Sequence, residues 1–279
     1  MGITGRETDH WDKISKGWDQ RGYSNELIAE HKRKIHLNLI ARWADLSKSH
    51  RILKTDLFEE ASGSDQFLFD LARANNDVIG IDVSNEIVAQ AKRQARHHGV
   101  DAGKYLCCDV RLLPLRDNSI DLIISNSTLD HFPTEEDILA ALKELGRVLR
   151  VGGNLILTLD NKSNLTYPPY IFMRLWMQLR LSPYFIGRTL SLASLVGALR
   201  EIGFSVEAST AIFHYPHPDG LVRLLESSLR KLSRGKLDYA IRKGLCLLDK
   251  LETKRTRYWT GRYIAVKAVK CQPWQPKRM

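Results

Sequence analysis

The sequence predicts an α/β fold in which a mostly parallel sheet is covered by helices on both faces. Between residues 51 and 160, short apolar runs alternate with helical periods of crossover length, and this alternation is typical of parallel βαβ units. Of the 279 residues, 43% are hydrophobic and 27% are charged, so the chain can bury a sizeable core. Two successive apolar runs also end in an aspartate, which predicts polar chemistry at the strand ends.

The first half of the chain has clear helix signals between the expected strands. Ser84 is a predicted N-cap, and Thr134 to Asp137 has the form of a capping box. The helix that this box opens ends at the turn Val151–Gly153. We expect strands at residues 51–56, 78–82, 105–109, 120–125 and 154–159, and helices at residues 65–74, 84–98 and from 134 onward.

The regular alternation stops after Asp160. Residues 161–189 are rich in aromatic side chains and prolines, and residues 215–259 read as a long basic helical stretch. Between them the pattern predicts a helix at 191–202, which Gly203 terminates, and a strand at 204–213. A last strand is expected at 262–269, and residues 7–45 at the N-terminus read as an amphipathic helical segment.

These changes of pattern divide the chain into segments. The core is expected at residues 49–214 and 260–270, and residues 161–190 form a lid insertion within it. We expect an N-terminal helical cap at residues 1–48, a basic helical insertion at 215–259 and a flexible tail at 271–279.

Several classes of protein are excluded by composition. No apolar run approaches the roughly 20 residues that a membrane-spanning helix needs. The four cysteines form no CxxC pair and no metal-ligand spacing, which indicates reduced thiols. Acidic residues near the N-terminus disfavour a signal peptide. We therefore expect a cytoplasmic protein with no bound metal, which associates at most peripherally with a membrane.

The basic charge is concentrated at the C-terminal end. Residues 219–279 hold 16 Lys or Arg against 5 Asp or Glu, a net charge of +11, which leaves −1 of the total +10 for residues 1–218. Such asymmetry indicates an anionic partner or a solvated helical face that aids solubility. Within residues 220–259, leucines recur at helical spacing among basic residues. This pattern fits an anionic membrane surface, although packing onto the domain or a partner subunit is favoured. Basic and aromatic residues alternate at 256–259, which keeps RNA as a further partner.

The aspartates at the strand ends predict a nucleoside site. Asp82 ends the second strand, where a carboxylate can accept both ribose hydroxyls. Asp109 ends the third strand and is placed to accept from an exocyclic amine, with Val110 beside the adenine face. Asn126 and Ser127 follow the fourth strand at the same edge. Either acid alone would be read as a cap of a helix or turn, but two at successive strand ends favour the nucleoside site.

Four segments in this order resemble class I S-adenosylmethionine-dependent methyltransferases of the small-molecule, ubiquinone-biosynthesis-like type. They are Val78–Ser84, Cys108–Leu115, Ile120–Phe132 and Leu145–Gly153. The resemblance implies a Rossmann-like sheet of seven strands whose last strand is antiparallel, with helices on both faces and helical insertions. It also implies S-adenosylmethionine as cofactor and methyl transfer from its sulfonium to a nucleophile. Together with the first loop, these segments supply the candidate cofactor contacts Asp56, Glu59, Gly63, Asp82, Val83, Asp109, Val110 and Asn126.

The first strand departs from this family's pattern. The family normally has a glycine-rich loop there, because glycine takes positive φ and lets the backbone approach the ligand. Here the segment Ile52–Gly63 retains only Gly63. We expect Asp56 or Glu59 to bind the amino group of the cofactor directly, with Gly63 opening the next helix. The alternative is a site that has decayed and binds nothing.

His131 is the candidate catalytic residue. It follows the fourth strand on the acceptor side, and its ordinary pKa of about 6.5 suits a general base. The favoured interpretation is a histidine that only shapes the cleft. Asp130 could orient the ring, but side chains that are neighbours in sequence often point apart. His214 and His217 lie in a later turn, where a surface position is favoured over the cleft.

The aromatic lid predicts a small-molecule or lipid-like acceptor, because function in such folds resides in grafted elements. No Asn-Pro-Pro-aromatic run follows the fourth strand, which disfavours methylation of adenine or of a glutamine amide. The alternatives are an RNA methyltransferase and a non-catalytic scaffold that keeps the fold. The oligomeric state stays open. The apolar wall of the lid is expected from Tyr167, Tyr170, Phe172, Met173, Trp176, Met177, Tyr184 and Phe185.

Overall fold

The computed structural model describes residues 11–12, 26–62, 66–74, 77–100, 103–167, 172, 187–214 and 234–272. Several expectations lie outside these residues. They concern Gly63, His217, nearly all of the lid between 168 and 186, the first part of the basic insertion, most of the N-terminal cap and residues 273–279 of the tail.

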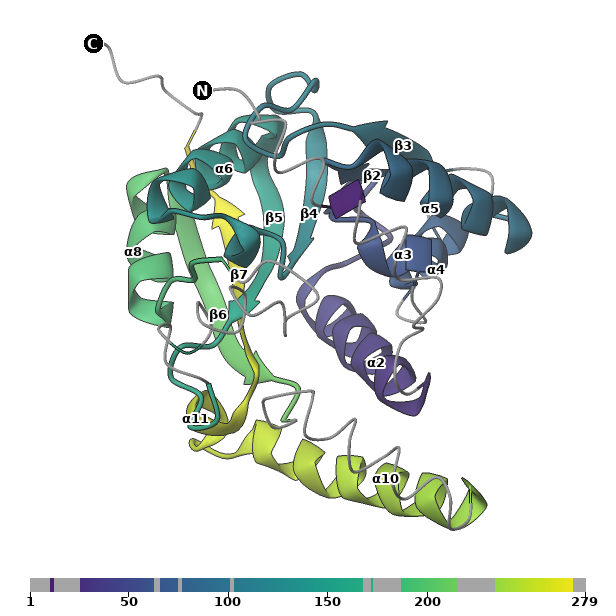
Figure 1. Cartoon of the computed structure of the whole chain (residues 1–279). Coiled ribbons are helices and arrows are strands. Elements are labelled where there is room, and N and C mark those ends of the chain that lie inside the picture. Colours follow the sequence, from purple (N-terminus) through teal and green to yellow (C-terminus); the bar gives the residue numbers. More distant parts are fainter. Residues whose placement is uncertain are drawn as a thin grey trace.

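A single sheet of seven strands forms the centre of the molecule (Figure 1). Its strand order is β3-β2-β1-β4-β5-β7-β6. The first five strands are parallel, and β7 runs antiparallel to both β5 and β6. This arrangement confirms the predicted sheet. The strands are β1 Arg51–Thr55, β2 Asp77–Asp82, β3 Lys104–Cys107, β4 Ile120–Asn126, β5 Leu149–Asp160, β6 Phe204–Ile212 and β7 Tyr263–Lys270.

Helices cover both faces of the sheet, and successive strand residues supply the two faces alternately. In β1, Ile52 packs with one helical layer while Leu53 packs with the other. The first layer contains α2 Glu26–Trp43, α3 Phe58–Ser62, α4 Phe67–Ala74 and α5 Asn85–His97. The second contains α6 Glu135–Val148 and α8 Leu192–Glu201.

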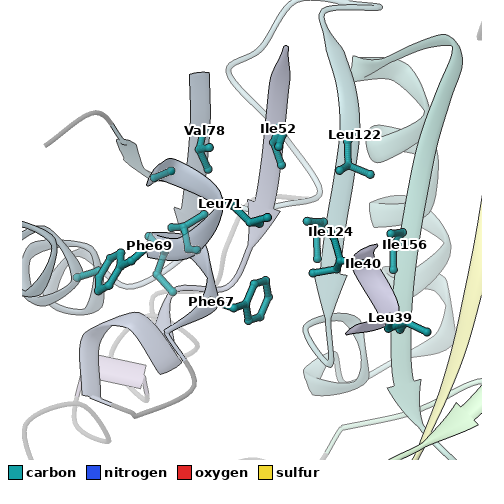
Figure 2. Close-up of a cluster of buried hydrophobic side chains, with 14 of the residues drawn as sticks. Leu39, Ile40, Ile52, Phe67, Phe69, Leu71, Val78, Leu122, Ile124 and Ile156 are labelled. Atoms are coloured by element: carbon teal, nitrogen blue, oxygen red, sulfur yellow. The ribbon is translucent and has the colours of Figure 1, made fainter. Parts of the chain in front are cut away.

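The core on the first face joins strands that are far apart in sequence. Figure 2 shows Ile52, Leu122 and Ile156 on neighbouring strands, with Phe67 of α4 and Leu39 of α2 against them. All five side chains are almost fully buried. Each buried side chain of this size contributes roughly 1.5–3 kcal/mol, so this layer fixes α2 and α4 on the sheet.

The expected starts of two helices and the stop at Gly203 are confirmed by their caps. The hydroxyl of Ser84 accepts the Ile87 N–H at 3.2 Å, and the hydroxyl of Thr134 accepts the Asp137 N–H at 3.2 Å. Gly203 follows α8 with φ of +93°, a conformation that glycine adopts without strain. Local sequence therefore sets where these helices begin and end.

Three elements differ from the prediction. Helix α6 ends at Val148 rather than at the turn 151–153, and β5 begins at Leu149 rather than at residue 154. The third strand ends at Cys107, so Asp109 lies in the loop beyond it. The Asp109 carboxylate accepts the N–H of Arg111, and its carbonyl accepts the N–H of Leu112, which starts a turn. The first loop contains an unpredicted short helix, α3, which begins at Phe58.

The described part of the basic insertion packs onto the domain. It comprises α10 Arg234–Asp249, the 3₁₀ turn η2 Lys250–Thr253 and α11 Arg257–Thr260. Helix α10 lies alongside α2 (Figure 1), where Arg242 pairs with Glu30 at 3.3 Å. Arg42 of α2 also pairs with Glu252 at 2.6 Å. These contacts support the packed interpretation for residues 234–259. Among the described residues, no helix has the length and apolarity that crossing a membrane requires.

Candidate active site

The carboxyl ends of three adjacent strands bring the predicted residues to one edge of the sheet. Thr55, the last residue of β1, is the register partner of Ile81 on one side and of Ser125 on the other. Asp56, Asp82 and Asn126 therefore emerge side by side. In open α/β sheets this edge is where ligands bind.

Asp82 is buried, with 8% of its surface exposed. Its Oδ2 accepts the N–H of Leu57 at 3.0 Å, and its Oδ1 accepts the N–H of Ser84 at 2.8 Å. Burial, followed by the negative charge of Asp56, raises the pKa of Asp82 to about 7. Each carboxylate oxygen has two lone pairs, so Asp82 retains capacity to accept hydroxyl groups.

Asp109 is also buried, at 9% exposure, and is held by Arg111. The Arg111 Nη2 lies 2.7 Å from Asp109 Oδ2, while its Nη1 lies 2.7 Å from Asp137 Oδ1 of α6. The same guanidinium lies 4.7 Å from the ring centre of Phe132. Arg111, which sequence reasoning missed, thus connects the loop after β3 to the segment after β4.

The two aspartates lie close to a common thiol. The N–H of Cys108 donates to the carbonyl of Asp82 at 2.9 Å, and Cys108 is the neighbour of Asp109 in the chain. Burial raises the pKa of the Cys108 thiol to about 12, and the charges of Cys107, Asp109 and Asp82 add to this effect. The carboxylates of Asp82 and Asp109 therefore lie in the same region of this sheet edge.

The loop after β1 is organised without glycine. Asp56 has φ of +69°, the left-handed conformation that a glycine would adopt freely. Its carbonyl accepts the Nζ of Lys54 at 2.6 Å, and Lys54 also pairs with Glu60 at 2.7 Å. Lys54 and Glu60 were missed in the sequence, although a lysine inside an apolar strand is an unusual signal.

The structure places the other predicted cofactor contacts, Glu59, Val83 and Val110, in three different environments. Glu59 is drawn toward α2, where its Oε1 lies 2.7 Å from the Nζ of Lys32. Val83 is half-buried beside Asp82, and the Val110 side chain is buried in the core on the α6 face. Of the two acids proposed for the amino group, the geometry therefore favours Asp56.

The segment after β4 carries buried polar groups. The carboxylate of Asp130 accepts the Ser127 hydroxyl and the Asp160 N–H through Oδ2, both at 2.7 Å. Because Asp130 Oδ1 has no hydrogen-bond partner among the described residues and Oδ2 is held by Ser127 and Asp160, Asp130 does not orient the imidazole of His131, which agrees with the alternative that neighbouring side chains point apart. Within the described part of the chain, Asp130 Oδ1 and Asn126 Nδ2 are buried without a hydrogen-bond partner.

The N-terminal residues Trp11 and Asp12 lie over the same edge. The Trp11 ring is 5.1 Å from the His131 ring and 6.2 Å from the Phe58 ring, in edge-on arrangements. The Asp12 carboxylate accepts the hydroxyl of Ser84. The sequence offers no local signal for these contacts, which connect segments that follow three different strands.

His214 lies neither in this cleft nor on the surface. It is buried at the end of β6, and its Nδ1 lies 2.9 Å from the Thr260 hydroxyl oxygen. Burial lowers its pKa. The described residues also contain no group of three or more His, Cys, Asp or Glu arranged to hold a metal ion.

This sheet order, with its antiparallel seventh strand and strand-end carboxylates, defines a class I methyltransferase fold. Residues 58–157 match the family model described as a methyltransferase domain. The chain therefore contains a methyltransferase domain with the fold of the class I, S-adenosylmethionine-dependent enzymes.

Similar proteins share this domain over part of their length. A malonyl-[acyl-carrier protein] O-methyltransferase of Hamiltonella defensa is 26% identical over 143 residues, which cover 51% of this chain and 50% of that protein. A mouse protein named "Probable tRNA methyltransferase 9B" is 30% identical over 142 residues, which cover 47% of this chain and 30% of that protein. The chain thus spans half or less of these relatives.

A solved structure shows the same fold. The phosphoethanolamine N-methyltransferase 2 of Haemonchus contortus, in complex with S-adenosyl-L-methionine, superposes with a TM-score of 0.54 at 19% identity. The superposition covers 85% of this chain and 52% of that one.

Proposed function

We propose that this protein transfers the methyl group of S-adenosylmethionine to a small-molecule or lipid-like acceptor. The observation that carries the proposal is the convergence of Asp82, Asp109 and Asn126 at the carboxyl edge of the sheet, next to Asp56. These residue types match the parts of the donor, which presents hydroxyls, an exocyclic amine and an ammonium group.

Each residue has a role that suits its chemistry. Asp82 accepts the ribose hydroxyls, and Asp109 accepts the exocyclic amine while Arg111 holds its carboxylate in place. Val83 flanks the base, whereas the Val110 side chain packs in the core. The Asn126 amide fits a ligand because its buried Nδ2 has no hydrogen-bond partner in the described structure. Asp56 supplies the carboxylate for the ammonium group.

Methyl transfer requires mainly positioning, because the sulfonium already makes the methyl carbon electrophilic. The chain contributes orientation of the donor and exclusion of water, for which Trp11 is placed beside Phe58 and His131. His131 removes a proton only from a nucleophile that carries one of high pKa. For an acceptor without such a proton, His131 shapes the cleft.

An RNA methyltransferase is the second candidate. It is favoured by the similarity to the tRNA methyltransferase and by the exposed Lys254, Arg255 and Trp259 near the end of the insertion. Against it, Arg242 of α10 is directed toward Glu30 of α2. Binding to RNA should fall steeply with salt if this candidate is right, and no retention on RNA at low salt would remove it.

Calorimetry with S-adenosylmethionine and S-adenosylhomocysteine tests the proposal. We expect binding of both to the wild type and none to Asp82→Ala. Asp77→Ala is the matched control, because Asp77 lies at the opposite end of β2 and pairs with Arg51 and Lys104. Absence of heat and of any thermal shift with both ligands would instead favour a non-catalytic scaffold.

A further inference from the structure

A fully buried ion pair lies directly beneath the proposed methionine end of the site. The side chains of Lys54 and Glu60 are 2% and 0% exposed, and Lys54 Nζ lies 2.7 Å from Glu60 Oε2. Removing two charges from water is costly even when they are paired. Apolar residues of similar volume would fill the same space, so packing alone does not account for the pair.

The pair connects three elements around the first loop. Lys54 comes from β1 and lies 4.8 Å from the ring centre of Phe67 in α4. Glu60 comes from α3, and its Oε1 accepts the N–H of Leu68 at 3.1 Å. The second hydrogen bond of Lys54 goes to the carbonyl of Asp56 at 2.6 Å. A movement of either charged residue therefore moves the loop.

The loop is fixed at Asp56, which holds an unusual backbone conformation. Its φ of +69° is uncommon for any residue with a Cβ. Its Oδ1 accepts the N–H of Phe58 at 2.6 Å, and the N–H of Leu57 donates to Asp82 at 3.0 Å. Within the described residues Asp56 Oδ2 has no hydrogen-bond partner, so one oxygen remains for a ligand.

The described residues around this loop carry more carboxyl groups than ammonium groups. The negative charge of Asp56 raises the pKa of both Asp82 and Glu60. The positive charge of Lys54 lowers the pKa of the same two groups. The Glu60 carboxylate contacts the Lys54 ammonium group directly, whereas Asp56 meets that group through its backbone carbonyl. The donor brings a sulfonium and an ammonium to this place, whereas its adenosine part brings no positive charge.

We propose that Lys54 and Glu60 are positioning residues that hold Asp56 in its left-handed conformation, so that the Asp56 carboxylate binds the ammonium group of the donor. This inference rests on the proposed function of the site. The buried pair takes the place of the missing glycines, because it stabilises by hydrogen bonding the backbone path that glycine takes without strain.

Two ligands separate this role from general damage to the site. S-adenosylmethionine carries the ammonium group, whereas 5′-methylthioadenosine has the same adenosine part and lacks the amino acid. The double variant Lys54→Met/Glu60→Gln removes both charges and leaves a side-chain oxygen at position 60 as an acceptor for the Leu68 N–H. Both charges are removed together because a protein tolerates the loss of a whole buried pair better than the loss of one partner. We expect the variant to bind S-adenosylmethionine about 10-fold more weakly and methylthioadenosine within about 2-fold of the wild type.

A mutant cycle with Asp56 tests the mechanism. Asp56→Asn keeps a side chain that tolerates positive φ and accepts the Phe58 N–H, but it removes the charge. It should show the same selective loss, and combining it with the double variant should add little further loss, since all three changes remove one interaction. Equal weakening of both ligands, no weakening of either, or full additivity would overturn the proposal.

Hydrogen exchange of the wild type tests the proposal without any variant, should the double variant fail to fold. S-adenosylmethionine should slow exchange at residues 56–62 more than methylthioadenosine does, and equal protection by both ligands would contradict the inference. If the wild type binds neither ligand, the proposed function itself fails. If it binds both and the variants leave their affinity ratio unchanged, only the role of Lys54 and Glu60 fails.

Discussion

The carboxylate of Asp82 accepts the backbone N–H of Leu57 at 3.0 Å, which ties the end of β2 to the loop after β1. The same carboxylate accepts the N–H of Ser84, the cap of α5. Asp82 therefore organises the two loops between which a ligand would lie, in addition to any contact with the ribose. The buried carboxylate of Asp82 thus belongs both to the proposed ligand site and to the hydrogen bonds that hold the surrounding loops.

Binding of S-adenosylmethionine should release protons near neutral pH. The pKa of Asp82 is raised to about 7 by burial, and hydroxyl donors from a ribose favour its ionised form, so binding lowers that pKa. Calorimetry at pH 6.5 in buffers of different ionisation enthalpy should show this release, and affinity should rise as pH increases through 7. Asp82→Asn should bind weakly and release none. An unchanged proton count in that variant would contradict the assignment.

The stability of the free protein should fall between about pH 4 and pH 7 through the same group. A carboxyl whose pKa is raised in the folded state binds more protons there than in the unfolded state, so its contribution is present below pH 4 and lost as pH rises through 7. Glu60, whose pKa burial also raises to about 7, acts in the same direction. Thermal unfolding measured from pH 4 to pH 7 should show this fall in the wild type and a smaller fall in Asp82→Asn, whose amide does not titrate.

Arg111 should matter for both stability and ligand binding. Arg111→Gln leaves the buried Asp109 without its cation and breaks the bond to Asp137. We expect a loss of about 1–3 kcal/mol in the free energy of unfolding and weaker binding of S-adenosylmethionine. Arg93→Gln is the control, because its pair with Glu86 is exposed and should contribute little. Denaturant titration of both variants makes the comparison, and equal losses would refute the bridging role.

Asn126 and Asn164 should show opposite effects. Within the described residues Asn126 Nδ2 has no partner, whereas Asn164 Nδ2 donates to the carbonyls of Thr260 and Gly261 at 3.0 and 2.9 Å. Asn126→Ala should therefore change stability by less than about 0.5 kcal/mol and weaken donor binding. Asn164→Ala should cost about 1–3 kcal/mol and leave binding intact. Melting temperatures and calorimetry separate the two results.

The fold could be predicted from local pattern where the pattern is strong. The second and fourth strands were placed within one residue at each end, because continuous burial requires continuous apolar runs, and the capped helices began where Ser84 and Thr134 indicated. Residues such as Asp82 were found because the end of a strand is visible in the sequence.

The rest depends on contacts between distant segments. Nothing near Lys54 in the sequence announces Glu60 as its partner, since α3 was read as an open loop. Arg111 likewise reaches Asp137 across 26 residues, and Trp11 reaches His131 across 120. Asp130 likewise bonds to Ser127 and to Asp160, 30 residues away, rather than to its neighbour His131. Such pairings are set by tertiary packing rather than by local propensity.

Gly187 offers a test of the acceptor side, because it packs against the backbone that carries His131. A Cβ at this position would lie 2.4 Å from the Asp130 carbonyl oxygen and 2.5 Å from the Phe132 carbonyl oxygen, and the next N–H, of Arg188, already donates to Phe132 at 2.8 Å. Backbone cannot yield as a flexible side chain does, so Gly187→Ala should displace the turn at residues 129–132.

We expect that variant to lose methyl transfer by 10-fold or more once an acceptor is known. S-adenosylmethionine, for which we propose Asp82 at the end of β2 and Asp109 in the loop after β3 as the main contacts, should bind within about 3-fold of the wild type. Gly197→Ala provides the control, because a Cβ there meets nothing within 4 Å and the helix α8 should gain about 0.5–1 kcal/mol. A Gly187→Ala enzyme with full turnover would show that the turn carrying His131 does not shape the acceptor site.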